Sequence, residues 1–352
     1  MRGDKVEWSP AVTVVVPVRN CEKTIGKTLD AIGKLDYPRD KLEVIVVDGI
    51  SSDKTKDIVQ QYPVRMLTQS AEGLNQARNA GLENSNGEII AYTDGDCVVS
   101  TKWLRKIVAN FDDPEVGAVG GNVVGYRKDN LFAQYADNSV IRVMPFSPRR
   151  VTLDRLKPFL YTPGCNMAFR RSALQKAGLF NPKIRHGFDE FETLERIIRT
   201  GSKIVFDPEV MVQHQHRSSL RETMRQAFNY GAGGALLMKM LPETVLGKWL
   251  RACLFGFIVY VLMVASLSSL LLLTGNLLYL VLVLGMLLFH VPILIVYYSG
   301  KSMNPRSFRR ILAFPIIDFL RTFSFCLGEA YAWIFVKADR AASPALPSFR
   351  TA

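Results

Sequence analysis

The chain has 352 residues, with 44 Lys and Arg against 32 Asp and Glu, which gives a formal net charge of +12. This length fits one large domain or two small ones. The excess positive charge indicates an anionic partner. The sequence has neither zinc-finger spacing nor basic repeats interleaved with aromatics, so we expect no nucleic acid. The 5 cysteines are scattered without metal-ligand spacing, which predicts reduced thiols in a cytoplasmic setting.

The first 215 residues alternate between strand-like and helix-like patterns. Short apolar runs predict strands at 12–17, 42–48, 64–67 and 89–93. Helical spacing predicts helices at 21–35 and 74–84, and Ser51, Ser52 and Asp53 offer caps for another that runs to Val59. Strands separated by helices imply parallel βαβ units. We therefore predict an α/β fold with a Rossmann-like, mainly parallel sheet flanked by helices.

Three carboxylates follow predicted strands. Asp48 ends the second strand, and Asp94 and Asp96 follow the fourth, separated by Gly95. Because alternate residues of a strand share a face, Asp94 and Asp96 can converge on one point, where their repulsion calls for a cation or for ribose hydroxyls. Parallel sheets bind ligands at the carboxyl ends of their strands. The three acids therefore predict a site for a nucleotide and a hard divalent ion.

Six segments resemble, in order and spacing, the family-2 glycosyltransferases, which have the GT-A fold. The matching segments are 14–20, 46–53, 73–81, 93–96, 164–170 and 188–214. The resemblance covers roughly residues 10–230, and it implies transfer of a sugar from a nucleoside-diphosphate sugar.

For the nucleotide, the resemblance implies a role for each matching residue. Asp48 would accept a hydrogen bond from the base, most often uracil, although guanine stays open. Pro17 and Arg19 would line the nucleoside pocket, and Arg78 would lie near the donor's pyrophosphate.

For the cofactor, the resemblance implies Mg²⁺ or Mn²⁺. Asp96 would ligate the ion, and Asp94 would reach the ribose or the metal. His214 resembles the family's late histidine near the diphosphate, with His216 as its local competitor. The ion would neutralise charge on the departing diphosphate.

The general base is sought where a predicted helix opens after Gly187. The family pattern reads Glu-Asp, then any residue, then an acid, whereas this chain has Asp189-Glu190 in reversed order and Glu192 as the later acid. Acids at a helix start also suit the helix dipole, so simple capping explains them too. The resemblance makes Glu190 the base by alignment, or Asp189 by residue type. The base takes the acceptor hydroxyl's proton, and a single base implies inversion.

The acceptor is expected between about residues 120 and 171, where Gly164, Cys165 and Asn166 resemble the segment that borders the acceptor pocket. The same region carries basic residues that form either a solvated loop or a contact with anionic lipid or a polyprenyl-linked phosphate: Arg142, Arg149, Arg150, Arg155 and Lys157. Gln226 opens a segment that loosely resembles the Gln-x-x-Arg-Trp element of processive synthases, but Asn and Tyr replace Arg and Trp. We therefore expect transfer of one or a few sugars.

The last third of the chain predicts a membrane domain. No Asp, Glu, Lys or Arg occurs from Ala252 to Gly300, which predicts spans at about 252–273 and 277–299. A third span is expected at 312–336, where Asp318 and Arg321 are spaced to pair on one helix face. The predicted domains are thus catalytic residues 1–215, an amphipathic interfacial helix and linker at 216–250, a membrane domain at 251–340 and a disordered tail at 341–352.

The orientation follows from the flanks of these spans. The start of the chain lacks the apolar core of a signal peptide, and both flanks of the hairpin are basic. We therefore expect a multi-pass protein of the plasma membrane with a cytoplasmic catalytic domain. The charges of Asp318, Arg321 and Glu329 in an apolar stretch suggest a homo-oligomer through the membrane helices.

The sequence thus predicts a metal-dependent, inverting glycosyltransferase that uses a nucleotide sugar, most often UDP-linked, and a lipid-linked saccharide acceptor. One alternative is a polyprenyl-phosphate monosaccharide synthase, whose phosphate nucleophile needs no strong base. A second is a non-catalytic, nucleotide-binding membrane scaffold. A sugar nucleotidyltransferase is a third, although such enzymes rarely carry a membrane hairpin.

Overall fold

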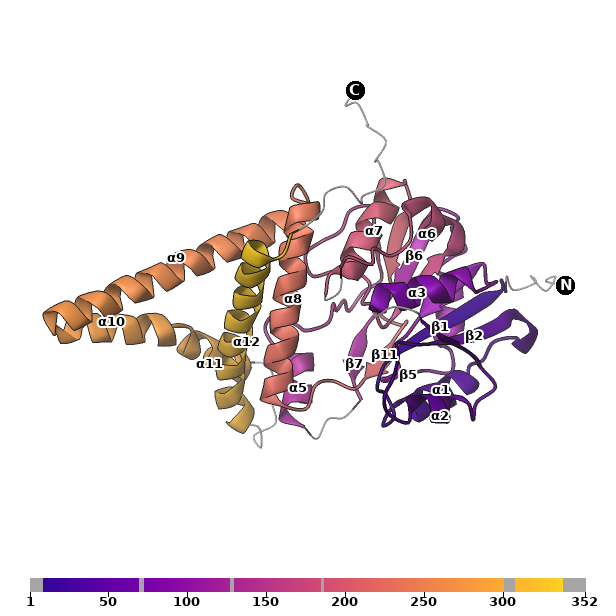
Figure 1. Cartoon of the computed structure of the whole chain (residues 1–352), viewed down its shortest axis with the longest axis horizontal. Helices are drawn as coiled ribbons and strands as arrows, with labels where there is room; N and C mark the ends of the chain where they lie inside the picture. Colours follow the sequence, from indigo (N-terminus) through magenta and orange to yellow (C-terminus); the bar gives the residue numbers. More distant parts are fainter. Residues whose placement is uncertain (1–8, 70–72, 127–129, 185–186, 301–307, 338–352) are drawn as a thin grey trace, which may run out of the picture. The chain divides into compact units, whose positions relative to one another are not determined.

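The computed structural model describes residues 9–69, 73–126, 130–184, 187–300 and 308–337 (Figure 1). The chain forms two compact units. The first unit comprises Met1–Arg127, Arg142–His216 and Arg340–Ala352, and the second unit comprises Lys128–Ile141 and Arg217–Asp339. The predicted tail at 341–352 lies outside the described residues.

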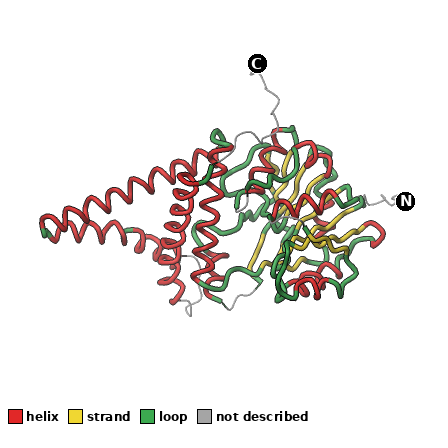
Figure 2. The backbone as a smooth tube through the Cα atoms, in the orientation of Figure 1, coloured by secondary structure: helices red, strands yellow, loops and turns green. Residues whose placement is uncertain are grey.

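An eight-stranded sheet flanked by helices is the framework of the first unit (Figure 2). Its strand order is β3 (Arg65–Thr68), β2 (Leu42–Asp48), β1 (Val12–Val18), β4 (Ile89–Tyr92), β9 (Met167–Arg170), β6 (Val116–Gly120), β10 (Lys203–Phe206) and β8 (Val151–Leu153). β9 runs antiparallel to β4 and β6, and β8 to β10, while the other pairs are parallel. The predicted mainly parallel α/β fold is confirmed.

The helices of the first unit are α1 (Ile25–Gly33), α2 (Thr55–Val59), α3 (Leu74–Glu83), α4 (Trp103–Ala109), α6 (Arg171–Ala177) and α7 (Asp189–Arg199), with a short 3-10 helix at Arg39–Lys41. The predicted helix at 21–35 is shorter than expected. The chain makes a turn at Cys21 instead, because the Cys21 N–H donates to Thr55 Oγ1 at 2.7 Å. Asp53 accepts the Thr55 N–H at 3.0 Å just before α2, but the N-cap of this helix is Lys54, so none of the three predicted residues caps it.

A crevice opens at the carboxyl end of β1, where the order of the strands changes direction. β1 pairs with β2 along its whole length, from Val12 to Val18, but with β4 only as far as Val15. Pro17 has no N–H to donate. Because it lies beyond the last residue of β1 that pairs with β4, the sheet loses no hydrogen bond between these two strands. The exits of β2 and β4 flank this point, where doubly wound sheets bind ligands.

A small second sheet brings a late part of the chain to the exit of β4. Its order is β5 (Cys97–Val99), β11 (Val212–His214) and β7 (Val123–Gly125). β11 pairs antiparallel with β5, so that His214 lies opposite Cys97. The Gln215 N–H also donates to the Asp96 carbonyl at 3.0 Å.

The second unit is helical, with α5 (Leu131–Asn138), α8 (Leu220–Met240), α9 (Val245–Thr274), α10 (Leu277–Leu288), α11 (His290–Gly300) and α12 (Phe308–Phe335). Three helical segments are long and apolar enough to cross a membrane: Val245–Thr274, Leu277–Gly300 and Phe308–Phe335. The break between α10 and α11 precedes Pro292, which cannot donate to a carbonyl one turn back.

Helices α8 and α12 pack backbone against backbone. A Cβ at Gly231 would lie 1.9 Å from the Phe325 carbonyl oxygen, and one at Gly328 would lie 2.0 Å from that of Phe228. Only glycine fits at these two crossings. The segment 216–250, predicted as an interfacial helix and linker, contains α8, which packs against α12, and its interfacial role stays a prediction.

A polar cluster inside the second unit ties α5 to the apolar helices. The hydroxyls of Tyr135 and Tyr298 donate to Asp318, and the Arg321 guanidinium donates to the Ile141 carbonyl at 2.6 Å. Among the described residues Asp318 and Arg321 share Tyr135 as a partner and form no direct ion pair, so the predicted pairing was wrong. These contacts explain why residues 128–141 belong to the second unit.

The charges that suggested a homo-oligomer are turned inward. Glu329 is completely buried within the second unit, and Asp318 is bound by two tyrosines. A homo-oligomer stays a prediction, and these residues give it no outward contact.

Candidate active site

The two acids after β4 lie beside the histidine that ends β11. Asp96 Oδ1 is 3.5 Å from His214 Nε2, with the two side chains 24% and 7% exposed. Gly95 between the acids has no room for a side chain, because a Cβ there would lie 2.8 Å from Val18 Cγ1. The tight turn therefore holds both carboxylates at the end of the crevice.

His214 rather than His216 faces the acids. The Nδ1 atoms of the two rings are 3.1 Å apart, so one donates to the other. This contact uses the inner nitrogen of His214 and directs its Nε2 toward Asp96. His216 is a neighbour that orients the ring of His214, the arrangement that metal-binding histidines commonly have.

The donor set at this point fits a hard divalent cation. Asp96, Cys97 and His214 place their ligand atoms within 4.8 Å of one another. A carboxylate oxygen and an imidazole nitrogen suit Mn²⁺ well, and Mg²⁺ through its preference for oxygen. Burial raises the pKa of the Cys97 thiol well above its usual value, so the sulfur stays protonated and is a poor ligand.

The pKa of Asp94 indicates that the negative charge of this carboxylate is not fully balanced by its neighbours. Burial raises the pKa of Asp94 to about 6, and the neighbouring charge of Asp96 adds to the rise while Arg78 opposes it. A carboxylate in this state gains from a cation or from a hydrogen-bond donor.

Arg78 is buried in a set of polar contacts, and its predicted place near the pyrophosphate stays a prediction. It is 1% exposed and forms an ion pair with Asp189, whose side chain is 8% exposed. Its Nη1 also donates to Asn75 Oδ1 at 3.1 Å and its Nη2 to the Gly164 carbonyl at 3.3 Å. These contacts make Arg78 a brace between α3, α7 and the segment before β9.

Glu190 lies next to this brace with a strongly altered acidity. Burial raises the pKa of Glu190 well above its usual value, and the adjacent charge of Asp189 raises it further. Glu190 Oε2 lies 3.8 Å from the position that a Cβ at Gly164 would take. The carboxyl of Asp189 is paired with Arg78, whereas that of Glu190 has a raised pKa.

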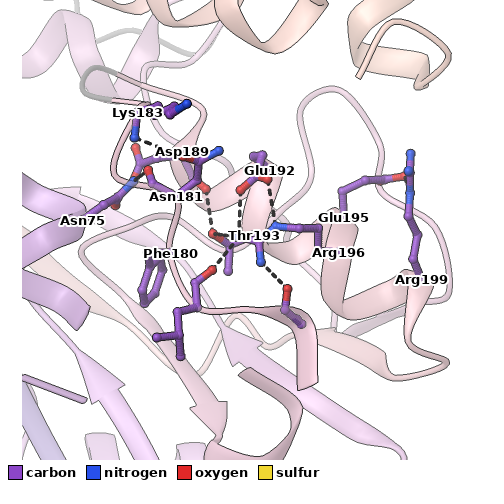
Figure 3. Close-up of polar contacts among 12 residues, drawn as sticks. Asn75, Phe180, Asn181, Lys183, Asp189, Glu192, Thr193, Glu195, Arg196 and Arg199 are labelled. Atoms are coloured by element: carbon purple, nitrogen blue, oxygen red, sulfur yellow. Dashed lines mark hydrogen bonds and ion pairs between the residues drawn. The ribbon is translucent and has the colours of Figure 1, made fainter. Parts of the chain in front are cut away.

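The start of α7 is held by a set of polar contacts (Figure 3). Glu192, the third acid of the motif, pairs with Arg196 at 2.8 Å, and Arg196 also donates to the Leu179 carbonyl at 2.5 Å. Phe188, the residue before α7, has φ 61°, a left-handed conformation that costs a non-glycine residue about 1–3 kcal/mol. The fold thus holds the base motif in one strained geometry.

The predicted acceptor segment reaches the site mainly through its backbone. Asn166 is completely buried: its side-chain oxygen accepts from Trp103 Nε1 at 2.9 Å, and its amide donates to the carbonyls of Asn122 and Val210. Cys165 is buried against the Cys97 thiol. Trp103 was missed in the sequence, where it reads as a core residue. Gln226 lies half-buried on α8 of the second unit, and its acceptor role stays a prediction.

The predicted nucleoside residues lie around the crevice at the end of β1. Asp48 is completely buried, accepts the Ser51 N–H at 3.2 Å, and lies 3.4 Å from the Lys56 ammonium. Pro17 is buried within β1, and Arg19 is exposed in the loop that follows. The structure brings these residues to one edge of the sheet, and their contacts with a nucleoside stay predictions.

This arrangement defines a glycosyltransferase with a GT-A-like fold. Residues 13–178 match the family described as glycosyl transferase family 2. Glycosyltransferase AglE of Haloferax volcanii is 30% identical over 231 residues, which cover 64% of this chain and 73% of that protein. The chain therefore belongs to glycosyl transferase family 2.

Two further comparisons extend the likeness toward the C-terminus. A dolichyl N-acetyl-α-D-glucosaminyl phosphate 3-β-D-2,3-diacetamido-2,3-dideoxy-β-D-glucuronosyltransferase of Methanococcus voltae is 24% identical over 322 residues, covering 85% of this chain and 99% of that protein. The mannosyltransferase PcManGT from Pyrobaculum calidifontis, solved in complex with GDP-Man and Mn²⁺, superposes with a TM-score of 0.58 at 23% identity. The superposition covers 90% of this chain and 88% of PcManGT. At this identity it supports a shared fold alone.

Proposed function

We propose that this glycosyltransferase moves a sugar from a nucleoside-diphosphate sugar to a lipid-linked saccharide, with inversion and with a divalent cation. The observation that carries the proposal is the approach of Asp96 to His214 at 3.5 Å, next to the half-buried Asp94. Three polar groups of this kind at a strand exit suit a cation and the diphosphate it neutralises.

The donor side of the site would work by charge and position. Asp96 and His214 would hold Mg²⁺ or Mn²⁺, with Asp94 reaching the ion or the ribose. When bound, the ion supplies Lewis acidity that stabilises the departing diphosphate. Asp48, Pro17 and Arg19 would bind the nucleoside.

Glu190 is our candidate for the general base, and Asp189 would position it. Arg78 pairs with Asp189, and burial together with the adjacent Asp189 carboxylate raises the pKa of Glu190. A base works best when its pKa lies near the working pH. A carboxylate on the acceptor side of the anomeric carbon would take the hydroxyl proton during in-line displacement, which inverts the configuration.

A lipid-linked acceptor is supported by the relatives and by the helices. The Methanococcus voltae relative acts, by its name, on a dolichyl phosphate-linked sugar. The three apolar helices of this chain would keep its site near a membrane. The exposed side chains of Lys248 and Arg251 at the start of α9 favour a cytoplasmic catalytic face by the positive-inside rule.

A ligand-stabilisation experiment tests the donor site. The purified full chain would be heated with UDP or GDP, each with Mn²⁺ or with EDTA. A ligand at 100 times its Kd adds about 2.7 kcal/mol to the free energy of unfolding, so a working site gives a clear rise in Tm. The rise should disappear with EDTA and in Asp96→Ala, and should persist in the control Asp112→Ala, which removes an exposed acid outside the site.

The result also selects among the alternatives. Stabilisation by one of the two diphosphates would identify the base of the donor. An unchanged Tm with both would contradict the donor site. Stabilisation by a nucleotide without measurable sugar transfer would favour the nucleotide-binding membrane scaffold. Transfer to polyprenyl phosphate in preference to a lipid-linked saccharide would favour the monosaccharide synthase.

A further inference from the structure

Most of the exposed apolar residues of α12 fall on one side of that helix. At 3.6 residues per turn, five exposed positions and the partly buried Phe323 lie within an arc of about 100°, while exposed Phe308, Trp333 and Phe335 lie outside it. We call the six positions the outer stripe: Leu312, Ile316, Phe323, Leu327, Tyr331 and Ile334. The side chains of Ile316 and Ile334 are 55% and 70% exposed. An exposed apolar surface of this size indicates contact with another protein or with a membrane.

Other sides of α12 are covered by helices α5 and α8 of the second unit. Tyr135 of α5, a helix that also carries Gln134, Asp137 and Asn138, donates to Asp318 at 2.7 Å. Met224 of α8 lies 3.4 Å from Ser324 Oγ, one turn from the exposed Arg221 and Arg225. These contacts fall in the middle of α12, where a membrane-spanning helix would meet hydrocarbon.

Helix α8 follows α12 over most of its length. After Met224 and the glycine crossings, the Lys239 ammonium donates to the carbonyls of Ala332 and Trp333 at 3.1 and 2.9 Å. If α12 crossed the bilayer, α8 would have to cross beside it and take Arg221 and Arg225 into the hydrocarbon. Burying such charges at the centre of a membrane costs about 2.5–3.5 kcal/mol each on the insertion scale.

The apolar hairpin leaves α12 from the side of the outer stripe. Phe257 of α9 meets Phe323 with ring centroids 5.3 Å apart, and His290 of α11 stacks on Phe319 at 4.9 Å. In Figure 1, α9 and α10 run away from the α8–α12 pair and cross its direction steeply. From Phe257 to the turn at Gly275 the hairpin extends about 27 Å at 1.5 Å per residue. This length is close to the thickness of a hydrocarbon core.

We propose that α12 lies along the polar–apolar boundary of the membrane, with the outer stripe toward lipid, and that only the hairpin of α9, α10 and α11 crosses. The partner of the outer stripe is a lipid bilayer. Exposed Arg221, Arg225 and Arg309 are placed to meet anionic headgroups, and Trp333 and Tyr331 are the aromatics that favour this boundary. The chain then crosses twice, and α12 lies on the face from which α9 starts.

A depth measurement tests the placement without relying on catalysis. A fluorescent noncanonical amino acid would be introduced singly at Ile316, Leu327 or Ile334 in the full chain, reconstituted in vesicles. Lipids brominated at defined chain depths would quench it. We expect all three positions at one shallow depth, with Leu262 of α9 as a deep control. A crossing helix would separate Ile316 from Ile334 by up to about 27 Å and overturn the proposal.

Counting the crossings gives a second, independent test. The full chain would carry a different epitope tag at each end, and protease would be added to sealed vesicles of both orientations. With two crossings, both ends of a chain lie on one side of the membrane, so a sealed vesicle exposes either both tags or neither. With three crossings, each chain in a sealed vesicle loses one tag and keeps the other until detergent is added. The second result would overturn the proposal.

Discussion

Two charged pairs in the site differ in how far their side chains are exposed to solvent. Arg78 and Asp189 form a closed pair, with side chains only 2% and 8% exposed, and Asn75 and the Gly164 carbonyl accept further hydrogen bonds from the two Nη atoms of the guanidinium. Asp96 and His214 form a looser pair at 3.5 Å, and Asp96 is 24% exposed. The closed pair holds elements together, whereas the open pair has capacity left for a ligand.

The charge balance of the two sides supports the same distinction. On the closed side one cation meets one anion, and burial raises the pKa of the neighbouring Glu190. On the open side Asp96 lies 3.5 Å from His214, and the charge of Asp96 adds to the burial that raises the pKa of Asp94. The following changes should therefore affect catalysis on the open side and folding on the closed side.

The largest effect is expected from Asp96→Ala. A bound cation contributes several kcal/mol of charge stabilisation, so its loss should lower sugar transfer by at least about 10³-fold. Transfer from a radiolabelled nucleotide sugar measures this, and Tm without ligand should hardly change. Asp112→Ala, an exposed acid on the same unit, should keep normal turnover. Equal losses in both variants would mean that Asp96 has no special role.

Arg78→Met should act on stability first. Removing one partner of a buried pair leaves Asp189 charged without compensation, which costs about 3 kcal/mol. Denaturant unfolding of the detergent-solubilised chain measures the loss. The double variant Arg78→Met with Asp189→Leu should recover part of it, because neither charge remains buried alone. A single variant as stable as the parent would contradict the closed pair.

Glu190→Gln should lower transfer about 10²-fold, the contribution of a modest general base, while leaving donor binding intact. Asp189→Asn is the matched comparison, and it should also weaken folding because it removes the partner of Arg78. A loss of less than about threefold in Glu190→Gln would argue for a nucleophile that needs no base, such as a phosphate.

The pH dependence follows from the same group. The pKa of Glu190 is raised, so activity should rise with pH through a midpoint above the ordinary glutamate value of about 4.3. The folded state holds this proton more tightly than the unfolded chain does. Glu190 therefore favours folding below its unfolded pKa, and this contribution is lost as pH rises through the folded value. Relative to the parent, Glu190→Gln should gain stability as pH rises, which a Tm series measures.

The open side was the part that local sequence could predict. Asp94, Gly95 and Asp96 are adjacent in the chain and follow an apolar strand, so their meeting is a local consequence of strand geometry. The closed side depends on contacts across 111 positions, from Arg78 to Asp189, which no local pattern contains. The pairing of Arg78 with Asp189 was therefore missed. Trp103 was missed for the same reason, since its bond to Asn166 joins residues 63 positions apart.

The smallest effect is expected from Cys97→Ser. This variant tests whether the Cys97 sulfur is one of the atoms that bind the ion on the open side. The thiol lies within 4.8 Å of the ligand atoms of Asp96 and His214, but its raised pKa keeps the proton on sulfur. A hard ion prefers oxygen and nitrogen donors, so the Kd for Mn²⁺ should change by less than about threefold. Stability should fall by about 1 kcal/mol, the worth of one hydrogen-bonded contact. Titration of Mn²⁺ by electron paramagnetic resonance measures the Kd. A rise of about 10²-fold would place the sulfur among the ligands, and the open side would then be a thiolate site with a preference for softer ions.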